Sequence, residues 1–303
     1  MPRVFVTREL PFPALDRLRA AHEVEVWPER MPPPPDALRE AAARADGLLT
    51  MLTDRVDAEL LDAAPDLRAV ANLAVGTDNI DLEAAAARRI AVGRTPDVLT
   101  DATADLAFAL LLAVARRLPQ GADFVRSGEW VTWEPAGDLG VEVTGATLGI
   151  VGWGRIGQAV ARRAQGFGME VIHSRPAPLE ELLERSDFVS LHVPLTPATR
   201  HVVDAAALAR MKPTAILVNT ARGGVVDQLA LAAALHAGEL GGAALDVTDP
   251  EPLPPDDPLL DAPNLLVVPH IGSATVRTRS RMADLAVDNL LAALAGEPMP
   301  HPA

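Results

Sequence analysis

The chain has 303 residues, which predicts two domains of about 150 residues each, or one large domain. With 27 Lys and Arg against 41 Asp and Glu, nucleic acids and anionic membranes are disfavoured as partners. The sequence contains no Cys and no Tyr, which excludes disulfides, thiolate nucleophiles, thiolate zinc sites and phenolic acids. Its longest apolar run, 106–115, is about half of a membrane span, so we expect a cytoplasmic protein.

Short apolar runs alternate with helical patterns through the first hundred residues. This alternation predicts a parallel sheet covered by helices, and hence an α/β fold. Strands are expected at 4–7, 47–52, 67–73 and 90–92, and helices at 13–21, 36–45 and 82–89, with Asp36 as an N-cap.

A longer helix is expected over 101–117, capped by Thr100. It is apolar on nearly all sides, which predicts burial between domains or between subunits. A second series of strands and helices then runs over 147–270. The tail 276–295 is again helical, and its pattern does not decide which series it joins.

A glycine-rich run follows the predicted strand 147–151 and opens a helix. In this context the spacing G-x-G-x-x-G is typical of a dinucleotide site, where backbone N–H groups and the helix dipole bind the pyrophosphate. The alternative is a tight turn without a ligand. The residues of the run are Gly152, Trp153, Gly154, Arg155, Ile156 and Gly157.

The next predicted strand, 170–173, carries no acid at its end to hold the ribose hydroxyls. It is followed instead by Ser174 and Arg175, whose hydroxyl and guanidinium suit a 2′-phosphate. This favours NADPH over NADH as the cofactor. Alternatively, Arg175 faces solvent and NAD is bound by other contacts.

Three later strands are each followed by polar residues, at the edge where open α/β sheets bind ligands. Arg222 follows 215–218, Glu251 follows 243–245, and His270 follows 265–268. Together they make a plausible anion clamp, orienting carboxylate and acid. Any one of them alone has an ordinary structural explanation.

The motifs together resemble the D-isomer-specific 2-hydroxyacid dehydrogenases, and among these the glyoxylate/hydroxypyruvate reductases. The resemblance covers essentially the whole chain, from RVFVTREL to GEPMP. It is carried by the runs VLTDATAD, GWGRIGQAVARR, NTARGGVVDQLAL, AALDVTDPEPLP and PHIGSATVRTRSRM.

The resemblance implies a role for each of the three residues. Arg222 would clamp the substrate carboxylate and polarise the keto oxygen, as suits its bidentate fork. His270 would be the general acid, since hydride attack leaves charge on that oxygen. Glu251 would orient His270 and favour its charged form.

The same resemblance implies further residues that contact the substrate or the cofactor. It implies no metal ligands. Val75 and Gly76 would offer N–H groups to the substrate carboxylate, with Ser273 also in the substrate site. On the cofactor side the resemblance implies Thr103, Thr220, Asp246 and Gly272.

The family also implies a domain plan. Residues 1–98 plus 276–303 would form a flavodoxin-like substrate domain, with a Rossmann NAD(P)-binding domain, 99–275, inserted in it and the active-site cleft between them. The stretch 100–140 would form the interface of a homodimer. Trp130 and Trp133 would either reach the neighbour's substrate pocket or pack at the interface.

The expected activity is reduction of glyoxylate or hydroxypyruvate to the D-2-hydroxy acid by hydride transfer from NADPH or NADH. The alternatives are a 3-phosphoglycerate dehydrogenase-like enzyme, less readily a phosphite or formate dehydrogenase, and a dinucleotide-sensing corepressor-like protein. The chain is short between Arg175 and Asp187. A helix and a short strand on the adenine side are therefore expected to be missing.

Overall fold

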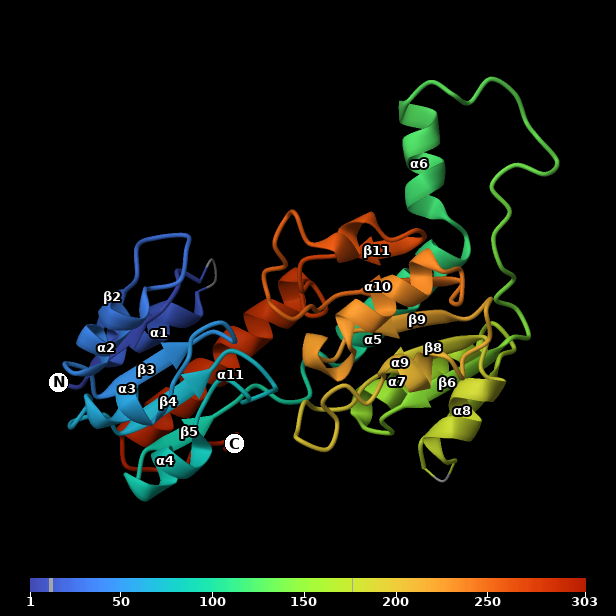
Figure 1. Ribbon diagram of the computed structural model, residues 1–303. Coiled ribbons are helices and arrows are strands. Elements are labelled where there is room, and N and C mark those ends of the chain that lie inside the picture. Colours follow the sequence, from blue (N-terminus) through green and yellow to red (C-terminus); the bar gives the residue numbers. More distant parts are fainter. Residues whose placement is uncertain (11–12, 176) are drawn as a thin grey trace. The chain divides into compact units, whose positions relative to one another are not determined.

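The computed structural model describes residues 1–10, 13–175 and 177–303. Contacts divide the chain into two units: unit 1 comprises Met1–Leu99 and Ala274–Ala303, and unit 2 comprises Thr100–Ser273 (Figure 1). Unit 2 is therefore inserted into the sequence of unit 1. Its two ends lie one and two residues from the boundaries expected at 98/99 and 275/276.

The sheet of unit 1 is five-stranded and parallel, in the order β2-β1-β3-β4-β5. The chain places β2 on one side of β1 and then crosses to the other side, which is the flavodoxin-like order. Apolar clusters cover both faces, so the central strands are buried along their length. The strands are β1 Arg3–Val6, β2 Glu23–Val26, β3 Gly47–Thr50, β4 Ala69–Asn72 and β5 Ala91–Gly93.

The C-terminal helix α11 belongs to unit 1, which settles the alternative that its pattern left open. It packs on α1, β3 and β4, and the side chains of Leu290 and Leu294 lie against Gly47. The helices of this unit are α1 Ala14–Ala21, α2 Pro35–Ala42, α3 Ala58–Asp62, α4 Leu82–Ala87 and α11 Val276–Leu294.

Two predicted helix caps are wrong. Helix α2 begins at Pro35, whose fixed φ suits the first helical position, so Asp36 lies inside the first turn and pairs with Arg39 at 3.1 Å. Thr100 is itself the first residue of helix α5 rather than its cap. The turn before it contains Asp97 at a φ of 71°, and this turn starts the helix one residue early.

The sheet of unit 2 is six-stranded and parallel, in the order β11-β10-β9-β8-β6-β7. From β6 the chain goes outward to β7 and then returns past β6 to β8, so the strand order reverses there. Among the described residues no strand lies beyond β7, although a helix, α8, does connect β7 to β8. The strands are β6 Thr147–Val151, β7 Glu170–His173, β8 Phe188–Leu191, β9 Ile216–Asn219, β10 Gly242–Leu245 and β11 Leu265–Val267.

The apolar helix α5 packs inside unit 2, where eight of its sixteen residues are buried, while Ala109 is exposed and Leu106, Leu112 and Ala113 are half-buried. Burial between domains or subunits therefore stays a prediction for this remaining face. The helix packs on α7 and on β9 and β10, so the sheet itself covers much of its apolar surface. The helices are α5 Thr100–Ala115, α6 Leu118–Arg126, α7 Arg155–Gln165, α8 Leu179–Arg185, α9 Ala205–Leu208 and α10 Gln228–His236, with short 3₁₀ turns η1 Gly223–Val225 and η2 Pro258–Asp261.

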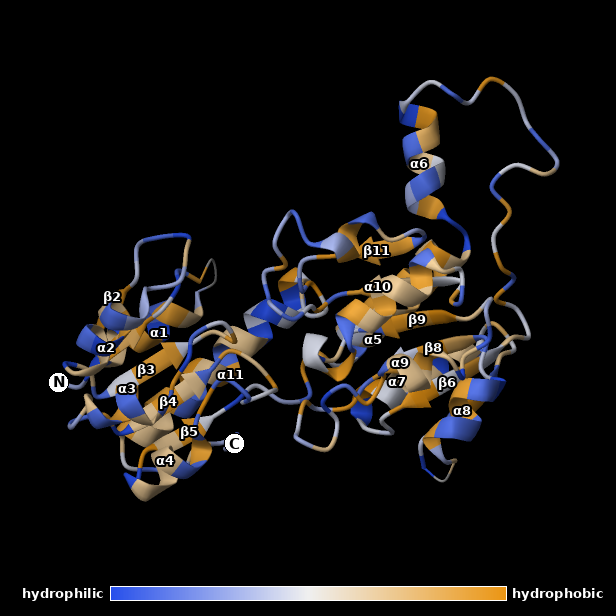
Figure 2. Cartoon of the chain, viewed as in Figure 1, coloured by the Kyte–Doolittle hydropathy of each residue, from blue (hydrophilic) through white to orange (hydrophobic). Residues whose placement is uncertain are grey.

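Helix α6 and the segment 127–142 project from the sheet of unit 2 as an arm (Figure 1). None of the residues of α6 is buried, and Figure 2 shows apolar positions scattered along the arm. Trp130 and Trp133 are 61% and 79% exposed. No described helix is long and apolar enough to cross a membrane.

Candidate active site

The glycine-rich loop after β6 contains three glycines, and the local geometry explains the lack of a side chain differently at each of them. Gly152 has a φ of 103°, and a Cβ there would lie 2.5 Å from the carbonyl oxygen of His192 at the end of β8. A Cβ on Gly157 would lie 2.2 Å from the oxygen of Gly152. At Gly154 a Cβ would meet open space, and no side chain caps the helix α7 that starts there. Backbone N–H groups are thus left for a phosphate, so the loop fits a dinucleotide.

A second feature of this edge also fits a ligand. Thr220, directly after β9, is 8% exposed, and its Oγ1 has no hydrogen-bond partner among the described residues. Buried hydroxyls nearly always have a partner. A polar group of a bound dinucleotide would satisfy this one, as the expected cofactor role of Thr220 requires.

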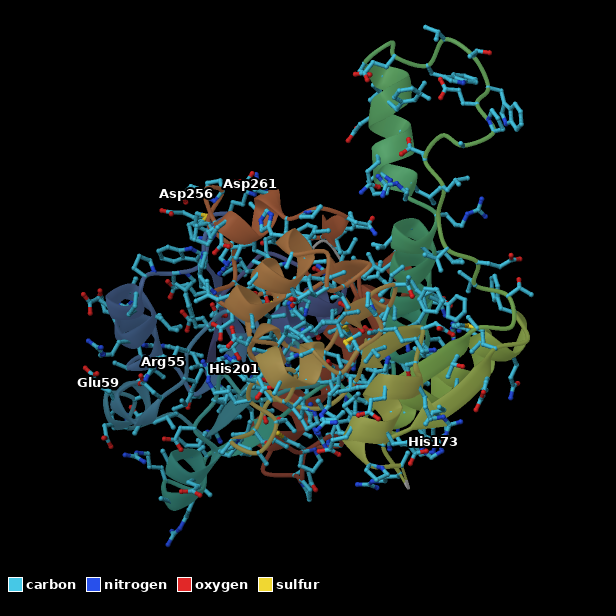
Figure 3. The ribbon with its side chains drawn as sticks, turned by 45° about the vertical axis from the view of Figure 1, so that its right-hand side comes forward. Arg55, Glu59, His173, His201, Asp256 and Asp261 are labelled. Carbon is cyan, nitrogen blue, oxygen red and sulfur yellow. The ribbon has the colours of Figure 1, made fainter. Side chains whose placement is uncertain are left out.

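The end of β7 is tied to the glycine-rich loop by two contacts. The backbone N–H of Gly152 donates to Ser174 Oγ at 3.0 Å, and the indole of Trp153 stacks on the ring of His173 at 3.7 Å between centroids. His173 lies at this edge of the sheet (Figure 3). The N–H of Arg175 donates to His173 Nδ1 at 3.3 Å, and the Arg175 side chain is exposed.

Arg222 stands in a tight turn after β9. The fully buried Asn219 builds that turn, since its Nδ2 donates to the Arg222 oxygen at 2.9 Å and its Oδ1 accepts from Ala221 N at 3.0 Å. A Cβ on the next residue, Gly223, would lie 2.0 Å from the carbonyl carbon of Thr248. The Arg222 turn therefore packs directly on the loop that follows β10 and leads to Glu251.

Glu251 and His270 are joined by a hydrogen bond between Oε1 and Nδ1. Their side chains are only 28% and 23% exposed. His270 has a φ of 50°, in the left-handed region, which costs a non-glycine residue about 1–3 kcal/mol. Because Glu251 holds Nδ1, the other ring nitrogen is the one left to exchange a proton with a ligand.

Asp246 fixes the backbone around His270. Its carboxylate accepts from Ile271 N at 2.6 Å and from Gly272 N at 2.8 Å, while its own carbonyl accepts from His270 N at 2.9 Å. Burial raises the pKa of Asp246, and the N–H donors and the charge of His270 oppose that rise. Thr103 Oγ1 donates to the Gly272 oxygen at 3.3 Å, so Thr103, Asp246 and Gly272 lie together, with Ser273 next in the chain.

In unit 1, Val75 and Gly76 lie half-buried on the loop after β4. Asn72 Nδ2 donates to the Gly76 oxygen at 3.0 Å and to Asn79 Oδ1 at 3.0 Å, and Asn79 in turn binds the backbone of Met51. Within the described residues the N–H groups of Val75 and Gly76 donate no hydrogen bond. The loop thus offers two donors on a braced backbone.

Comparison with known proteins shows to which family this chain belongs. A sequence profile described as "D-isomer specific 2-hydroxyacid dehydrogenase, NAD binding domain" matches residues 108–272. The glyoxylate reductases of Korarchaeum cryptofilum and Thermococcus gammatolerans are each 51% identical, over 99% of this chain and 95% of theirs. The chain belongs to the D-isomer specific 2-hydroxyacid dehydrogenases.

Solved structures agree with this assignment. A Thermus thermophilus protein has a TM-score of 0.94 at 53% identity over 99% of both chains. An NADPH-dependent glyoxylate/hydroxypyruvate reductase of Sinorhizobium meliloti, in complex with NADP and malonate, has a TM-score of 0.87 at 36% identity, over 100% of this chain and 96% of that one. The two-sheet α/β architecture and the NAD(P)-dependent dehydrogenase class are thereby confirmed.

For this dehydrogenase, sequence reasoning named the residues at the strand ends but missed those that hold them. Trp153 and Asn219 lie inside the motif runs and Asn72 does not, but the sequence indicates a supporting role for none of them, because their contacts depend on how the loops fold. Among the described residues no group of three His, Asp or Glu side chains is placed to hold a metal ion.

Proposed function

We propose that this dehydrogenase reduces a small 2-keto acid, glyoxylate or hydroxypyruvate, to the 2-hydroxy acid, in the D-configuration where the product is chiral. The proposal is carried by the contact between His270 and Glu251, in a chain about half identical over its length to proteins named glyoxylate reductase. The reaction consumes the keto acid, NAD(P)H and one proton, and releases the hydroxy acid and NAD(P)⁺.

When bound, the reduced nicotinamide supplies a hydride to the keto carbon. The task of the protein is then to supply a proton to the keto oxygen, which we assign to Nε2 of His270 because Glu251 occupies Nδ1. The hydrogen bond of Glu251 to Nδ1 fixes the orientation of the ring, and the proton to be transferred is the one on Nε2 of the imidazolium. The loss of its proton leaves a neutral imidazole, which solvent reprotonates.

We assign the substrate carboxylate to Arg222 and to the N–H groups of Val75 and Gly76, with Ser273 as a further contact. A guanidinium binds a carboxylate through two parallel hydrogen bonds, and its charge also draws electrons from the adjacent keto group. The brace of Asn219 under Arg222 supports this assignment, because it fixes the backbone from which the long side chain extends.

For the cofactor we propose NADPH in preference to NADH. The support is the absence of an acid at the end of β7 and the presence there of Ser174 and the exposed Arg175, which suit a 2′-phosphate. The pyrophosphate is assigned to the loop Gly152, Gly154, Arg155, Ile156 and Gly157, and the nicotinamide end to Thr103, Thr220, Asp246 and Gly272.

The test is the initial rate of loss of absorbance of the reduced cofactor, with glyoxylate, hydroxypyruvate and pyruvate each crossed with NADPH and NADH. We expect rapid turnover of the first two substrates, with NADPH preferred. Binding of dinucleotide without turnover of any of these acids would overturn the proposed substrate class.

We further propose a homodimer formed through the arm of α6 and 127–142, and we keep the predicted cytoplasmic location. The support is the exposed apolar surface of the arm, which includes Phe124, Val125, Val131 and the two tryptophans. Light scattering on a purified Trp130→Ser, Val131→Ser variant should show a monomer where the wild type is a dimer. A wild-type monomer would refute the dimer.

A further inference from the structure

The loop that carries Glu251 is held by apolar packing only at its two ends, where Val247 is buried and Leu253 packs against the core of unit 2. Between these ends Asp249, Pro250 and Pro252 are exposed, although the strand β10 before them is buried and the Glu251 side chain is 28% exposed. A surface hollow of about 340 Å³ opens beside the loop, lined by Asp249 and by Arg200 and His201. The position of the Glu251 carboxylate on His270 therefore depends on the close packing of Gly223 against Thr248 and Asp249 and on polar anchors.

The strongest of these anchors is Gln228, 21 residues before Asp249 and at the first position of α10. Its Nε2 donates to the Asp249 oxygen at 2.7 Å, and its Oε1 accepts from the Asp249 N–H at 2.7 Å. The planar amide thus pairs with both backbone groups of one residue, which fixes the direction of the chain there. Glu251 is only two residues further on.

The N-terminal end of α10, from which the Gln228 side chain extends, is held firmly in unit 2. Asp227 caps α10 by accepting from Ala230 N at 3.1 Å, and the backbone before it pairs with Val203. Leu231 is fully buried, and Leu235 is 2% exposed. The amide of Gln228 therefore extends from a helix end that the core of unit 2 holds in place.

The other anchors constrain the loop less. Arg200 reaches Asp249 Oδ2 only at 3.5 Å, and both side chains are about half exposed, so this pair contributes little. Thr248 Oγ1 donates to the Pro250 oxygen at 2.8 Å, which shapes the loop locally but does not tie it to another element. Gln228 makes the paired hydrogen bonds that join the loop to a distant helix.

We propose that Gln228 is a positioning residue for the reaction: it holds the Asp249 backbone so that Glu251 stays on Nδ1 of His270. The kinetic part of this proposal rests on the proposed function. Of the described residues, Glu251 is hydrogen-bonded to His270 and the charge of Asp246 also acts on it. We propose that Gln228 acts on Glu251 and contacts neither the substrate nor the cofactor.

The experiment compares Gln228→Met, which keeps the length of the side chain and removes both hydrogen bonds, with Glu251→Gln and the wild type. We expect Gln228→Met to lower kcat about tenfold with the dissociation constant for NADPH unchanged. The alkaline fall of kcat/KM should move to lower pH, in the same direction as in Glu251→Gln. Gln165→Met, at the exposed end of α7, is the matched control and should leave kcat and the pH dependence of kcat/KM unchanged.

A kcat or a pH profile for Gln228→Met equal to that of the wild type would overturn the proposal. If the Met variant fails to fold, Gln228→Asn takes its place, since it keeps the amide but shortens its reach by one methylene. In Gln228→Asn the alkaline fall of kcat/KM should likewise move to lower pH.

A readout independent of turnover separates this proposal from the choice of substrate. The proton between His270 and Glu251 should give a far-downfield proton resonance in the wild type and in Gln165→Met. We expect it to be shifted or lost in Gln228→Met and absent in Glu251→Gln. If no keto acid is turned over but the resonance responds to Gln228, the substrate is wrong and the positioning role stands.

Discussion

The two ends of the sheet in unit 2 are built differently. At the β9–β11 end, Asn219, Asp246 and Gln228 each make two hydrogen bonds that hold the loops of Arg222, Glu251 and His270. At the β7 end, Ser174 has one bond to the glycine-rich loop and Arg175 extends from an edge strand. The groups proposed for proton transfer are thus held by more hydrogen bonds within the protein than the end that we assign to the adenine.

The largest effect should come from the ordered end. His270→Ala should lower kcat by ~10²–10⁴, because it removes the proposed general acid. Steady-state rates with glyoxylate measure this, and His236→Ala, at the exposed end of α10, is the control. A kcat near that of the wild type would remove His270 from the acid role.

Arg222→Lys should be nearly as harmful as Arg222→Ala, because a single ammonium does not reproduce the paired hydrogen bonds of the guanidinium. We expect kcat/KM for the keto acid to fall about 10- to 100-fold, with KM raised and kcat lowered. Full-progress kinetics at several substrate concentrations separate the two constants. Unaltered keto-acid kinetics in both variants would refute the clamp.

His192, at the end of β8 between the two regions, should make folding sensitive to acid. Burial lowers the pKa of His192 to about 4 from its ordinary 6.5. The unfolded chain takes up this proton near 6.5 and the folded chain only near 4, so the free energy of unfolding falls as the pH drops through that window.

We expect this contribution to reach about 1–2 kcal/mol between pH 6.5 and 5. Urea unfolding at both pH values measures it, and His192→Asn, which cannot titrate, should lose correspondingly less stability. Equal losses in the variant and the wild type would contradict the prediction.

The smallest effect should come from the loosely ordered end. Arg175→Asp should weaken NADPH binding about tenfold and leave NADH binding nearly unchanged, since only the 2′-phosphate loses a partner. Titration with each cofactor tests this, with Arg44→Asp in unit 1 as a control for the same change of charge. A constant ratio of the two affinities would mean that Arg175 faces solvent.

The sequence predicted most of the sheet and the residues at its working edge, because buried parallel strands are apolar and the loops after them carry distinctive polar motifs. It failed where the signal is weak: β2 reads Glu-Val-Glu-Val on an edge, and α3 has five residues. The cap at Asp36 was wrong because Pro35 already sets the start of the helix.

The contacts that hold the site residues in place could not be predicted from sequence motifs. The pairing of Gln228 with Asp249 joins residues 21 positions apart through an amide and a backbone, and although both lie in motif runs, the sequence does not show that they pair. The stack of Trp153 on His173 likewise depends on β6 and β7 being neighbours. Such contacts follow from the three-dimensional arrangement of loops, so only the structure reveals them.

The left-handed backbone conformation of His270 lowers the stability of the fold at a residue that the proposed reaction needs. Glycine adopts a φ of 50° without steric strain, so the backbone by itself favours glycine there, while the proposed proton transfer requires the imidazole. A lineage that no longer needed the reaction would gain stability by losing this side chain. Among descendants of this chain, the inactive ones are therefore expected to be harder to melt than the active ones.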